Sequence, residues 1–191
     1  MAQYVNQKWG KANILVNCIG MTKIVPYDRL DQLTEDDFAK IFAVNVTAPY
    51  LAVQAFESLL RSSSNSAIVN VSSISAMNGY GSSIAYSASK GGLNTLTLAL
   101  AQALAPNVRV NAVCPGFIDS SWWEESTAKD VEKYKSLVKS VKERSLLNQV
   151  IKPDDVAEVI VNIIKSSRMT GELIRIDSGA HLSGSHNTYT T

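Results

Sequence analysis

Residues 67–92, which read AIVNVSSISAMNGYGSSIAYSASKGG, contain a strand pattern followed by a helix pattern. The run from Ala67 to Ser72 has little polar alternation, which predicts a strand covered on both faces. A helical pattern extends from about Tyr86 to Ala105 and ends before Pro106. Because parallel strands need a crossover connection, a strand followed by a long helix predicts a parallel α/β sheet.

The same alternation of strand and helix patterns continues along the chain. Further strands are predicted at Asn13 to Asn17, Val108 to Val113 and Glu172 to Ile176. A capping box at Thr34 predicts the start of a helix that continues towards Leu60, and Pro153 occupies a favoured first helical position. A charged run from Lys129 to Arg144 predicts an amphipathic helix. Without repeats or a low-complexity linker, we expect residues 1–191 to form a single domain.

Composition excludes several classes of function. The chain has 191 residues, 46% of them hydrophobic, and a net charge of +1, which predicts one soluble domain that binds neither nucleic acid nor an anionic membrane. No apolar run approaches the ~18 residues of a membrane span, and the N-terminus lacks a signal-peptide core, so a cytoplasmic location is expected. Cys18 and Cys114 lack metal-site spacing, and both are predicted to be small buried side chains.

Tyr86 and Lys90 are four positions apart, so a helix presents both side chains on one face. A nearby ammonium favours the phenolate, which predicts a tyrosine pKa lowered towards neutrality and a group able to exchange a proton. The alternative is an aromatic side chain packed in a core beside a solvated lysine. This spacing alone does not separate the two interpretations.

Ser73 lies thirteen residues before Tyr86, directly after the strand predicted at 67–72. With these residues the chain resembles the short-chain dehydrogenase/reductase family, and in particular its 3-oxoacyl-carrier-protein reductase-like and glucose-dehydrogenase-like members. The resemblance implies that Ser73 holds a substrate carbonyl and that Tyr86 is the general acid and base. It also implies that Lys90 lowers the pKa of Tyr86 and holds the nicotinamide ribose.

Three further segments carry the resemblance. Asn45 in FAVNVTAPY is similar to the family's proton-relay asparagine, although an ordinary amide on a helix face is the alternative. The segment VCPGFIDS, residues 113–120, is similar to the segment beside the nicotinamide, although an ordinary turn is the alternative. VNCIG aligns with the family's Asn-Asn-Ala-Gly turn. The resemblance thus implies a site for NAD or NADP formed by Asn17, Gly20, Tyr86, Lys90, Pro115, Gly116, Ile118 and Ser120, without a metal.

The chain also departs from the family pattern. Cys18 and Ile19 stand where asparagine and alanine are usual, and Ser178 stands where glycine is usual. No glycine-rich turn connects a strand to a helix, although a dinucleotide fold needs one to bring pyrophosphate to a helix N-terminus. The resemblance therefore implies a Rossmann-like, doubly wound parallel sheet that lacks its first βαβα portion. The strand at 13–17 is then expected to be a bare edge.

Two functions remain as hypotheses. The first is an NAD(P)-dependent oxidoreductase that transfers hydride between nicotinamide and the carbonyl or alcohol carbon of a small molecule, as a homo-oligomeric dimer or tetramer. The second is a truncated, non-catalytic product that associates with full-length subunits. Trp122 and Trp123 are predicted to form either an apolar wall of a substrate lid or an anchor for their loop. His181 and His186 are predicted to be exposed without a carboxylate partner.

Overall fold

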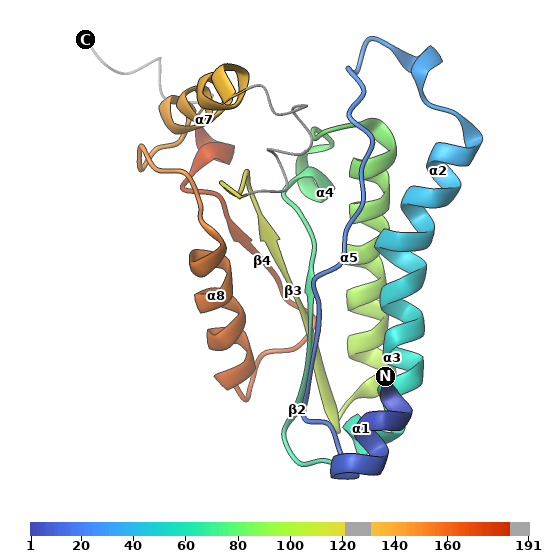
Figure 1. The fold of residues 1–191 in the computed structure, drawn as a ribbon. Coiled ribbons are helices and arrows are strands. Elements are labelled where there is room, and N and C mark those ends of the chain that lie inside the picture. The colour runs from blue at the N-terminus through green and yellow to red at the C-terminus, as the bar shows by residue number, and fades with distance from the viewer. Residues whose placement is uncertain (121–130, 184–191) are drawn as a thin grey trace.

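The computed structural model describes residues 1–120 and 131–183 (Figure 1). These residues contain one four-stranded parallel sheet in the order β1-β2-β3-β4. The strands are β1 (Ile14–Asn17), β2 (Ser66–Val71), β3 (Val108–Pro115) and β4 (Leu173–Ile176). Because all four run parallel, their carboxyl ends lie along the same edge of the sheet. The prediction of an α/β, Rossmann-like fold is confirmed.

Helices cover both faces of the sheet (Figure 1). One face carries α3 (Ala48–Arg61) and α5 (Ile84–Leu104), and the other carries α8 (Pro153–Lys165). Consecutive residues of β2 point to opposite faces. Ile68 packs in the cluster with α3 and α5, whereas Val69 packs with α8. The other α-helices within residues 1–120 and 131–183 are α1 (Ala2–Trp9), α2 (Glu35–Phe42), α4 (Ser75–Asn78) and α7 (Val131–Arg144).

Strand β1 is an edge strand, since among the described residues it pairs only with β2. Ile14 and Val16 are each 39% exposed, as expected for apolar side chains at a sheet edge without a further neighbour.

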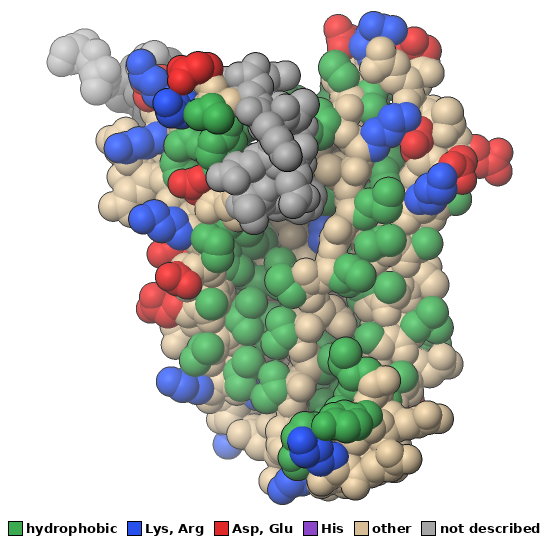
Figure 2. All heavy atoms as spheres, viewed as in Figure 1, with side chains coloured by type: hydrophobic (Ala, Val, Ile, Leu, Met, Phe, Trp, Pro, Cys, Tyr) green, Lys and Arg blue, Asp and Glu red, His purple; other side chains and the backbone are tan. Residues whose placement is uncertain are grey.

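Figure 2 shows hydrophobic side chains gathered over the middle of this view, between charged groups at its margins. In the described part of the chain, no helix is long and apolar enough to cross a membrane.

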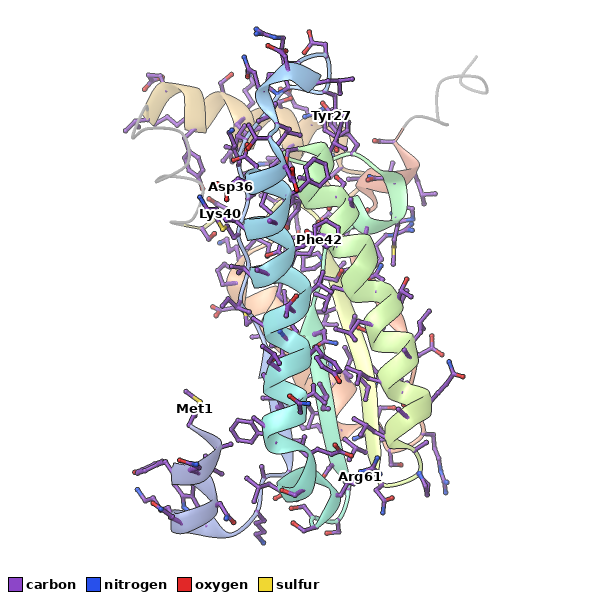
Figure 3. The ribbon with its side chains drawn as sticks, turned by 90° about the vertical axis from the view of Figure 1, so that its right-hand side faces the viewer. Met1, Tyr27, Asp36, Lys40, Phe42 and Arg61 are labelled. Atoms are coloured by element: carbon purple, nitrogen blue, oxygen red, sulfur yellow. The ribbon has the colours of Figure 1, made fainter. Side chains whose placement is uncertain are left out.

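The helix predicted from Thr34 towards Leu60 is interrupted by one π-helical turn, Ala43–Thr47, between α2 and α3. In Figure 3, which is turned so that these helices face the viewer, Phe42 lies where α2 meets α5. A Cβ at Gly92 of α5 would lie 3.3 Å from Val46 Cγ2 and 3.7 Å from Phe42 Cε1. A glycine in α5 therefore lets the π turn pack closely against that helix.

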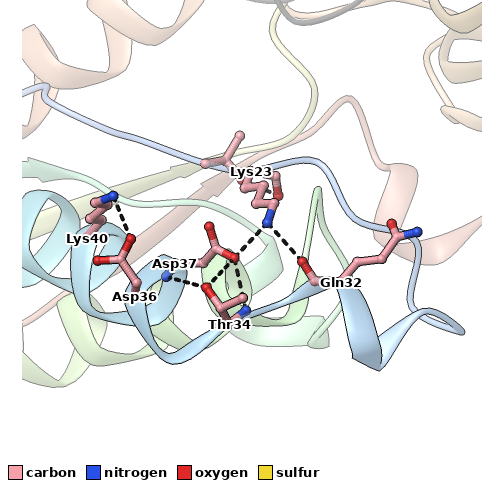
Figure 4. Close-up of polar contacts among 7 residues, drawn as sticks. Lys23, Gln32, Thr34, Asp36, Asp37 and Lys40 are labelled. Atoms are coloured by element: carbon pink, nitrogen blue, oxygen red, sulfur yellow. Dashed lines mark hydrogen bonds and ion pairs between the residues drawn. The ribbon is translucent and has the colours of Figure 1, made fainter.

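The start of α2 is held by the predicted capping box (Figure 4). Asp37 N donates to Thr34 Oγ1 at 3.2 Å, and Thr34 N donates to Asp37 Oδ2 at 2.9 Å. Lys23 Nζ adds an ion pair with Asp37 at 2.7 Å and donates to Gln32 O at 2.9 Å. The hydrogen bond from Lys23 is the main cause that lowers the pKa of Asp37 to about 2. These contacts tie the segment that follows β1 to the first turn of α2.

Candidate active site

A pocket of about 630 Å³ lies at the carboxyl edge of the sheet. It is bounded by the segments that follow β1, β2 and β3 and by the first turns of α5, the usual place for a ligand in an open α/β sheet. Eight of the sequence-predicted residues line it: Gly20, Ser73, Tyr86, Lys90, Pro115, Gly116, Ile118 and Ser120. Asn17 and Asn45 are buried and are not lining residues of this pocket. Sequence motifs from four segments thus meet at one cavity.

Tyr86 lies in the first turn of α5, where Ser83 caps the helix by accepting a hydrogen bond from Tyr86 N at 3.2 Å. Its removal from water raises the pKa of the Tyr86 phenol, and a hydrogen bond with Ser73 acts in the opposite direction with a smaller effect. The prediction that the pKa of Tyr86 is lowered was therefore wrong for this structure. Burial outweighs the favourable contacts of the phenolate.

Lys90 is buried, with 3% of its surface exposed, so the alternative of a solvated lysine is excluded. Its Nζ donates to Val71 O at 2.9 Å and lies 5.8 Å from the centre of the Tyr86 ring. Burial lowers the pKa of Lys90 to about 8, and the nearby Cys18 and Cys114 thiols partly oppose this shift. The ammonium is therefore positioned beside Tyr86 on the face that the spacing predicted.

Asn45 lies in the π turn and is fully buried. Its Nδ2 donates to Met21 O and to Ser89 Oγ, both at 2.9 Å, while its Oδ1 accepts from Met21 N at 2.8 Å. Ser89 Oγ in turn donates to Tyr86 O at 2.7 Å. The side chain of Asn45 thus joins the segment after β1 to the first turns of α5. π turns are frequent at functional sites, and this one orients the amide inward.

The segment VNCIG begins in a buried amide chain and ends in the pocket. Asn17 Nδ2 donates to Asn70 Oδ1 at 2.8 Å, and Asn70 Nδ2 donates to Thr97 Oγ1 at 2.9 Å. Cys18, however, is exposed and lines the pocket, so the prediction that it is buried was wrong. The reason is that the residues after β1 follow an edge strand, and the sequence run alone did not show this. Cys114 is buried as predicted.

The segment after β3 is tightly packed at Gly116. A Cβ there would lie 3.0 Å from Asp177 Cβ and 3.2 Å from Asp177 Cα, so a larger residue would displace the chain. Ile118 forms a parallel bridge with Ile151, and Asp119 accepts a hydrogen bond from Tyr134 OH of α7. Helix α7, part of the predicted charged run, adds Leu137 and Arg144 to the pocket lining. Trp122 and Trp123 lie outside the described residues.

The loop after β4 differs from its prediction. His181 is exposed, as predicted, but its Nδ1 lies 2.8 Å from Asp177 Oδ2, so the prediction that it has no carboxylate partner was wrong. The buried Asp177 also accepts from the backbone N–H groups of Gly179 and His181 at 3.0 Å. Ser178 has φ +52°, a left-handed conformation that glycine adopts more readily. His186 lies outside the described residues.

The sequence analysis missed part of the pocket wall. Tyr80, Gly81 and Ser82 line the pocket, and the phenol of Tyr27 hydrogen-bonds to their loop. Tyr27 is 52 residues from Gly79 in sequence, and no local spacing connects the two. Only the position of Tyr80 to Ser82 between Ser73 and Tyr86 could have indicated that this segment lies at the site.

Comparisons with known proteins agree with this geometry. Residues 1–181 match the family model described as Enoyl-(Acyl carrier protein) reductase. The chain is 34% identical to the 3-oxoacyl-[acyl-carrier-protein] reductase FabG of Thermotoga maritima, over 94% of this chain and 70% of that protein. It is 41% identical to the short-chain dehydrogenase/reductase homolog YusR of Bacillus subtilis, over 70% of this chain and 97% of that protein.

Solved structures also resemble the chain. The structure of ElxO with NADP bound superposes with a TM-score of 0.82 and is 26% identical, covering 94% of this chain and 71% of that one. The matched part of the chain thus covers about 70% of the length of FabG and of ElxO. It covers 97% of the length of YusR.

Proposed function

Since the chain belongs to the short-chain dehydrogenase/reductase family, we propose that it transfers hydride between a nicotinamide cofactor, NAD or NADP, and the carbonyl or alcohol carbon of a small molecule. The observation that carries this proposal is that Ser73, Tyr86 and Lys90 line the same pocket, although they come from two elements. Four sequence motifs that lie far apart along the chain contribute to that pocket.

The direction of the pKa shift of Tyr86 favours reduction. Because burial raises that pKa, the phenol keeps its proton at neutral pH and can donate it to a carbonyl oxygen. Ser73 Oγ accepts a hydrogen bond from Ser75 N at 3.1 Å, which leaves the Ser73 hydroxyl proton for another acceptor. We propose that this hydroxyl donates to the same carbonyl oxygen and stabilises negative charge that develops there.

The residues present fit the nicotinamide end of the cofactor, which supplies the hydride when bound. Lys90 Nζ uses one of its hydrogens for Val71 O, and the others can hold ribose hydroxyl groups. Among the described lining residues are the cations Lys90 and Arg144 and no Asp or Glu, which suits an anionic dinucleotide. Gly20 borders the ammonium directly, since a Cβ at Gly20 would lie 3.7 Å from Lys90 Nζ, at van der Waals distance.

We propose that Asn45 connects this site to solvent protons through the Ser89 and Met21 groups that its side chain contacts. Asn17 supports the cofactor site indirectly, because its side-chain amide holds the end of β1 against Asn70 of β2. Pro115, Gly116, Ile118 and Ser120 would then lie beside the nicotinamide, on the pocket wall that follows β3. The substrate is a small ketone or alcohol, with Trp122 and Trp123 as further candidates for its apolar wall.

We also propose that the protein is a homo-oligomer. Tyr50, Leu51 and Leu98 are apolar or aromatic side chains of α3 and α5 that are each at least 40% exposed. The second candidate function, association with longer subunits without catalysis of its own, is favoured by the open edge of β1. Its exposed Ile14 and Val16 would be covered by such a partner.

Isotope transfer tests the proposal directly. The chain is incubated with ketones and with NADH or NADPH that carries deuterium at the transferable position. We expect deuterium at the carbinol carbon of the alcohol product, which is detected by mass spectrometry. The absence of label with the chain alone would contradict the oxidoreductase function. Co-elution of the chain with a longer family member in size-exclusion chromatography would then support the second candidate.

A further inference from the structure

The phenol oxygen of Tyr27 lies at the centre of a hydrogen-bond cluster. It donates to Gly79 O at 2.8 Å and accepts from Gly81 N at 2.9 Å. Ser87 Oγ lies 2.8 Å from the same oxygen. Because the phenol has a single proton, a Tyr27 that donates to Gly79 O accepts from the Ser87 hydroxyl. One oxygen thus connects the segment after β1, the chain at 79–83 and the first turn of α5.

The 79–83 loop, which connects α4 to α5, is held closely by its surroundings. A Cβ at Gly81 would lie 2.9 Å from Ser75 Cβ and 3.1 Å from Ser87 Oγ. The loop ends at Ser83, whose hydroxyl caps the turn that carries Tyr86. The position of this loop therefore sets the position of the pocket wall.

The ring of Tyr27 supports a second aromatic side chain. Tyr27 and Tyr80 stack with their ring centroids 5.0 Å apart and their planes inclined by 30°. Tyr80 is 70% exposed and lines the same pocket as Ser73 and Tyr86. In Figure 3, Tyr27 lies beside the upper end of α5, on the face away from the sheet. The exposed ring of Tyr80 is thus supported from behind by Tyr27.

We propose that Tyr27 is a positioning residue that fixes the 79–83 loop and thereby holds Tyr80 as a wall for a flat apolar group on the carbonyl substrate. This inference rests on the proposed function for its substrate class. An aromatic ring beside the reacting carbonyl can stack on Tyr80, whereas a short aliphatic chain gains little from that surface. Tyr27→Phe keeps the ring that stacks on Tyr80 and removes only the hydroxyl. It therefore separates the contribution of the hydrogen bonds from that of the ring stacking.

Hydrogen exchange of the 191-residue chain tests the positioning role without turnover. In Tyr27→Phe we expect the amide of Gly81 to exchange about tenfold faster, since it loses its acceptor. Tyr4→Phe is the matched control, because Tyr4 is 57% exposed on α1 and its hydroxyl accepts a hydrogen bond only from Lys8 of the same helix among the described residues. An unchanged Gly81 exchange rate in Tyr27→Phe would overturn the positioning role.

Binding of acetophenone and 2-butanone, followed by NMR titration, tests the substrate class separately. We expect Tyr27→Phe to weaken acetophenone binding about fivefold and to change 2-butanone binding by less than about twofold. Tyr80→Ala, which alters an exposed side chain and leaves the core intact, should reproduce this difference. Equal losses for both ketones, or none, would overturn the inference.

Steady-state kinetics distinguish the inference from the proposed function. If the chain reduces both ketones, Tyr27→Phe should raise KM for acetophenone and leave kcat and the KM for the cofactor unchanged. A fall in kcat with an unchanged KM would contradict the positioning role. If the chain reduces neither ketone, the exchange and binding measurements still decide the role of Tyr27, and the isotope-transfer experiment decides the proposed function.

Discussion

The two halves of α5 are built from different kinds of residue. Its C-terminal half places Leu100, Ala101 and Leu104 in an apolar cluster with the sheet. Its N-terminal half buries the polar side chains of Ser87, Ser89 and Lys90, and the buried polar residues Asn94 and Thr97 follow near the middle of the helix. One helix therefore stabilises the fold at one end and presents reactive groups at the other.

The buried polar half is tolerated because its groups have hydrogen-bond partners. Ser89 donates to Tyr86 O, Lys90 to Val71 O, and Thr97 to Leu93 O. Burial of a polar group costs free energy unless it is hydrogen-bonded, and burial of a charge costs more. Burial of these groups in the N-terminal half therefore lowers the free energy of unfolding, but it holds the Lys90 ammonium beside the Tyr86 phenol. Substitutions in the two halves should change different properties of the protein.

The largest effect is expected for Tyr86→Phe. This substitution removes the proton donor and keeps the ring, so turnover should fall by about 100-fold or more while the free energy of unfolding barely changes. Tyr4→Phe, on the exposed surface of α1, is the control. The measurement compares the rates at which the original chain and the Tyr86→Phe variant reduce a ketone, each with NADH or NADPH bound. A near-normal rate would contradict the claim that the N-terminal half of α5 supplies the proton donor.

Leu104→Ala should lower the stability of the fold and leave turnover unchanged, which is the opposite of the effect of Tyr86→Phe. Leu104 is 4% exposed in the apolar cluster, so its truncation should lower the free energy of unfolding by about 3 kcal/mol. Urea denaturation gives this value, with Val161→Ala on the exposed side of α8 as the control. At temperatures where the variant is folded, kcat should match that of the original chain. A large loss of kcat would show that the two halves are not independent.

Lys90 should produce a pH dependence of stability. Its pKa falls from 10.5 to about 8 on folding, so the unfolded chain binds more protons between these values. The free energy of unfolding should therefore rise by about 2 kcal/mol as the pH increases from 8 to 10. Above pH 10 the raised pKa of Tyr86 acts in the opposite direction, because the unfolded phenol loses its proton first.

Denaturation of Lys90→Met across the same pH range provides the comparison. The rise between pH 8 and pH 10 should be absent from this variant, because methionine has a similar length and no charge. A rise of the same size in both proteins would assign the effect to other groups.

The smallest effect is expected at Thr97, where the two halves meet. Its Oγ1 accepts from Asn70 Nδ2 at 2.9 Å, so Thr97→Val leaves a buried amide without this acceptor. We expect a loss of about 1–2 kcal/mol in the free energy of unfolding. Thr97→Ser, which keeps the hydroxyl, should lose less. If Thr97→Val also lowered kcat, the reactive half would extend one turn further than proposed.

The sequence predicted the chain path well and the electrostatics less well. The spacing of Tyr86 and Lys90 was sufficient to place both on one helical face, because helical geometry is local. The pKa of Tyr86 depends on how much water the surrounding segments exclude, and Cys18 is exposed because β1 is an edge strand. Neither property is encoded in a local pattern. The same holds for Tyr27, whose partners lie 52 to 60 residues away.

The π turn at Ala43–Thr47 restricts changes in chain length. A π turn contains one more residue than the α-helical turn it replaces, so deletion of one residue there would restore an ordinary helix. Because the π turn absorbs the additional residue, α2 and α3 would keep their faces towards the core, but the side chains within the turn would change direction. Asn45 would then lose its hydrogen bonds with Met21. Natural variation in length should therefore avoid residues 43–47 and occur instead in the exposed turn at 62–65, between α3 and β2.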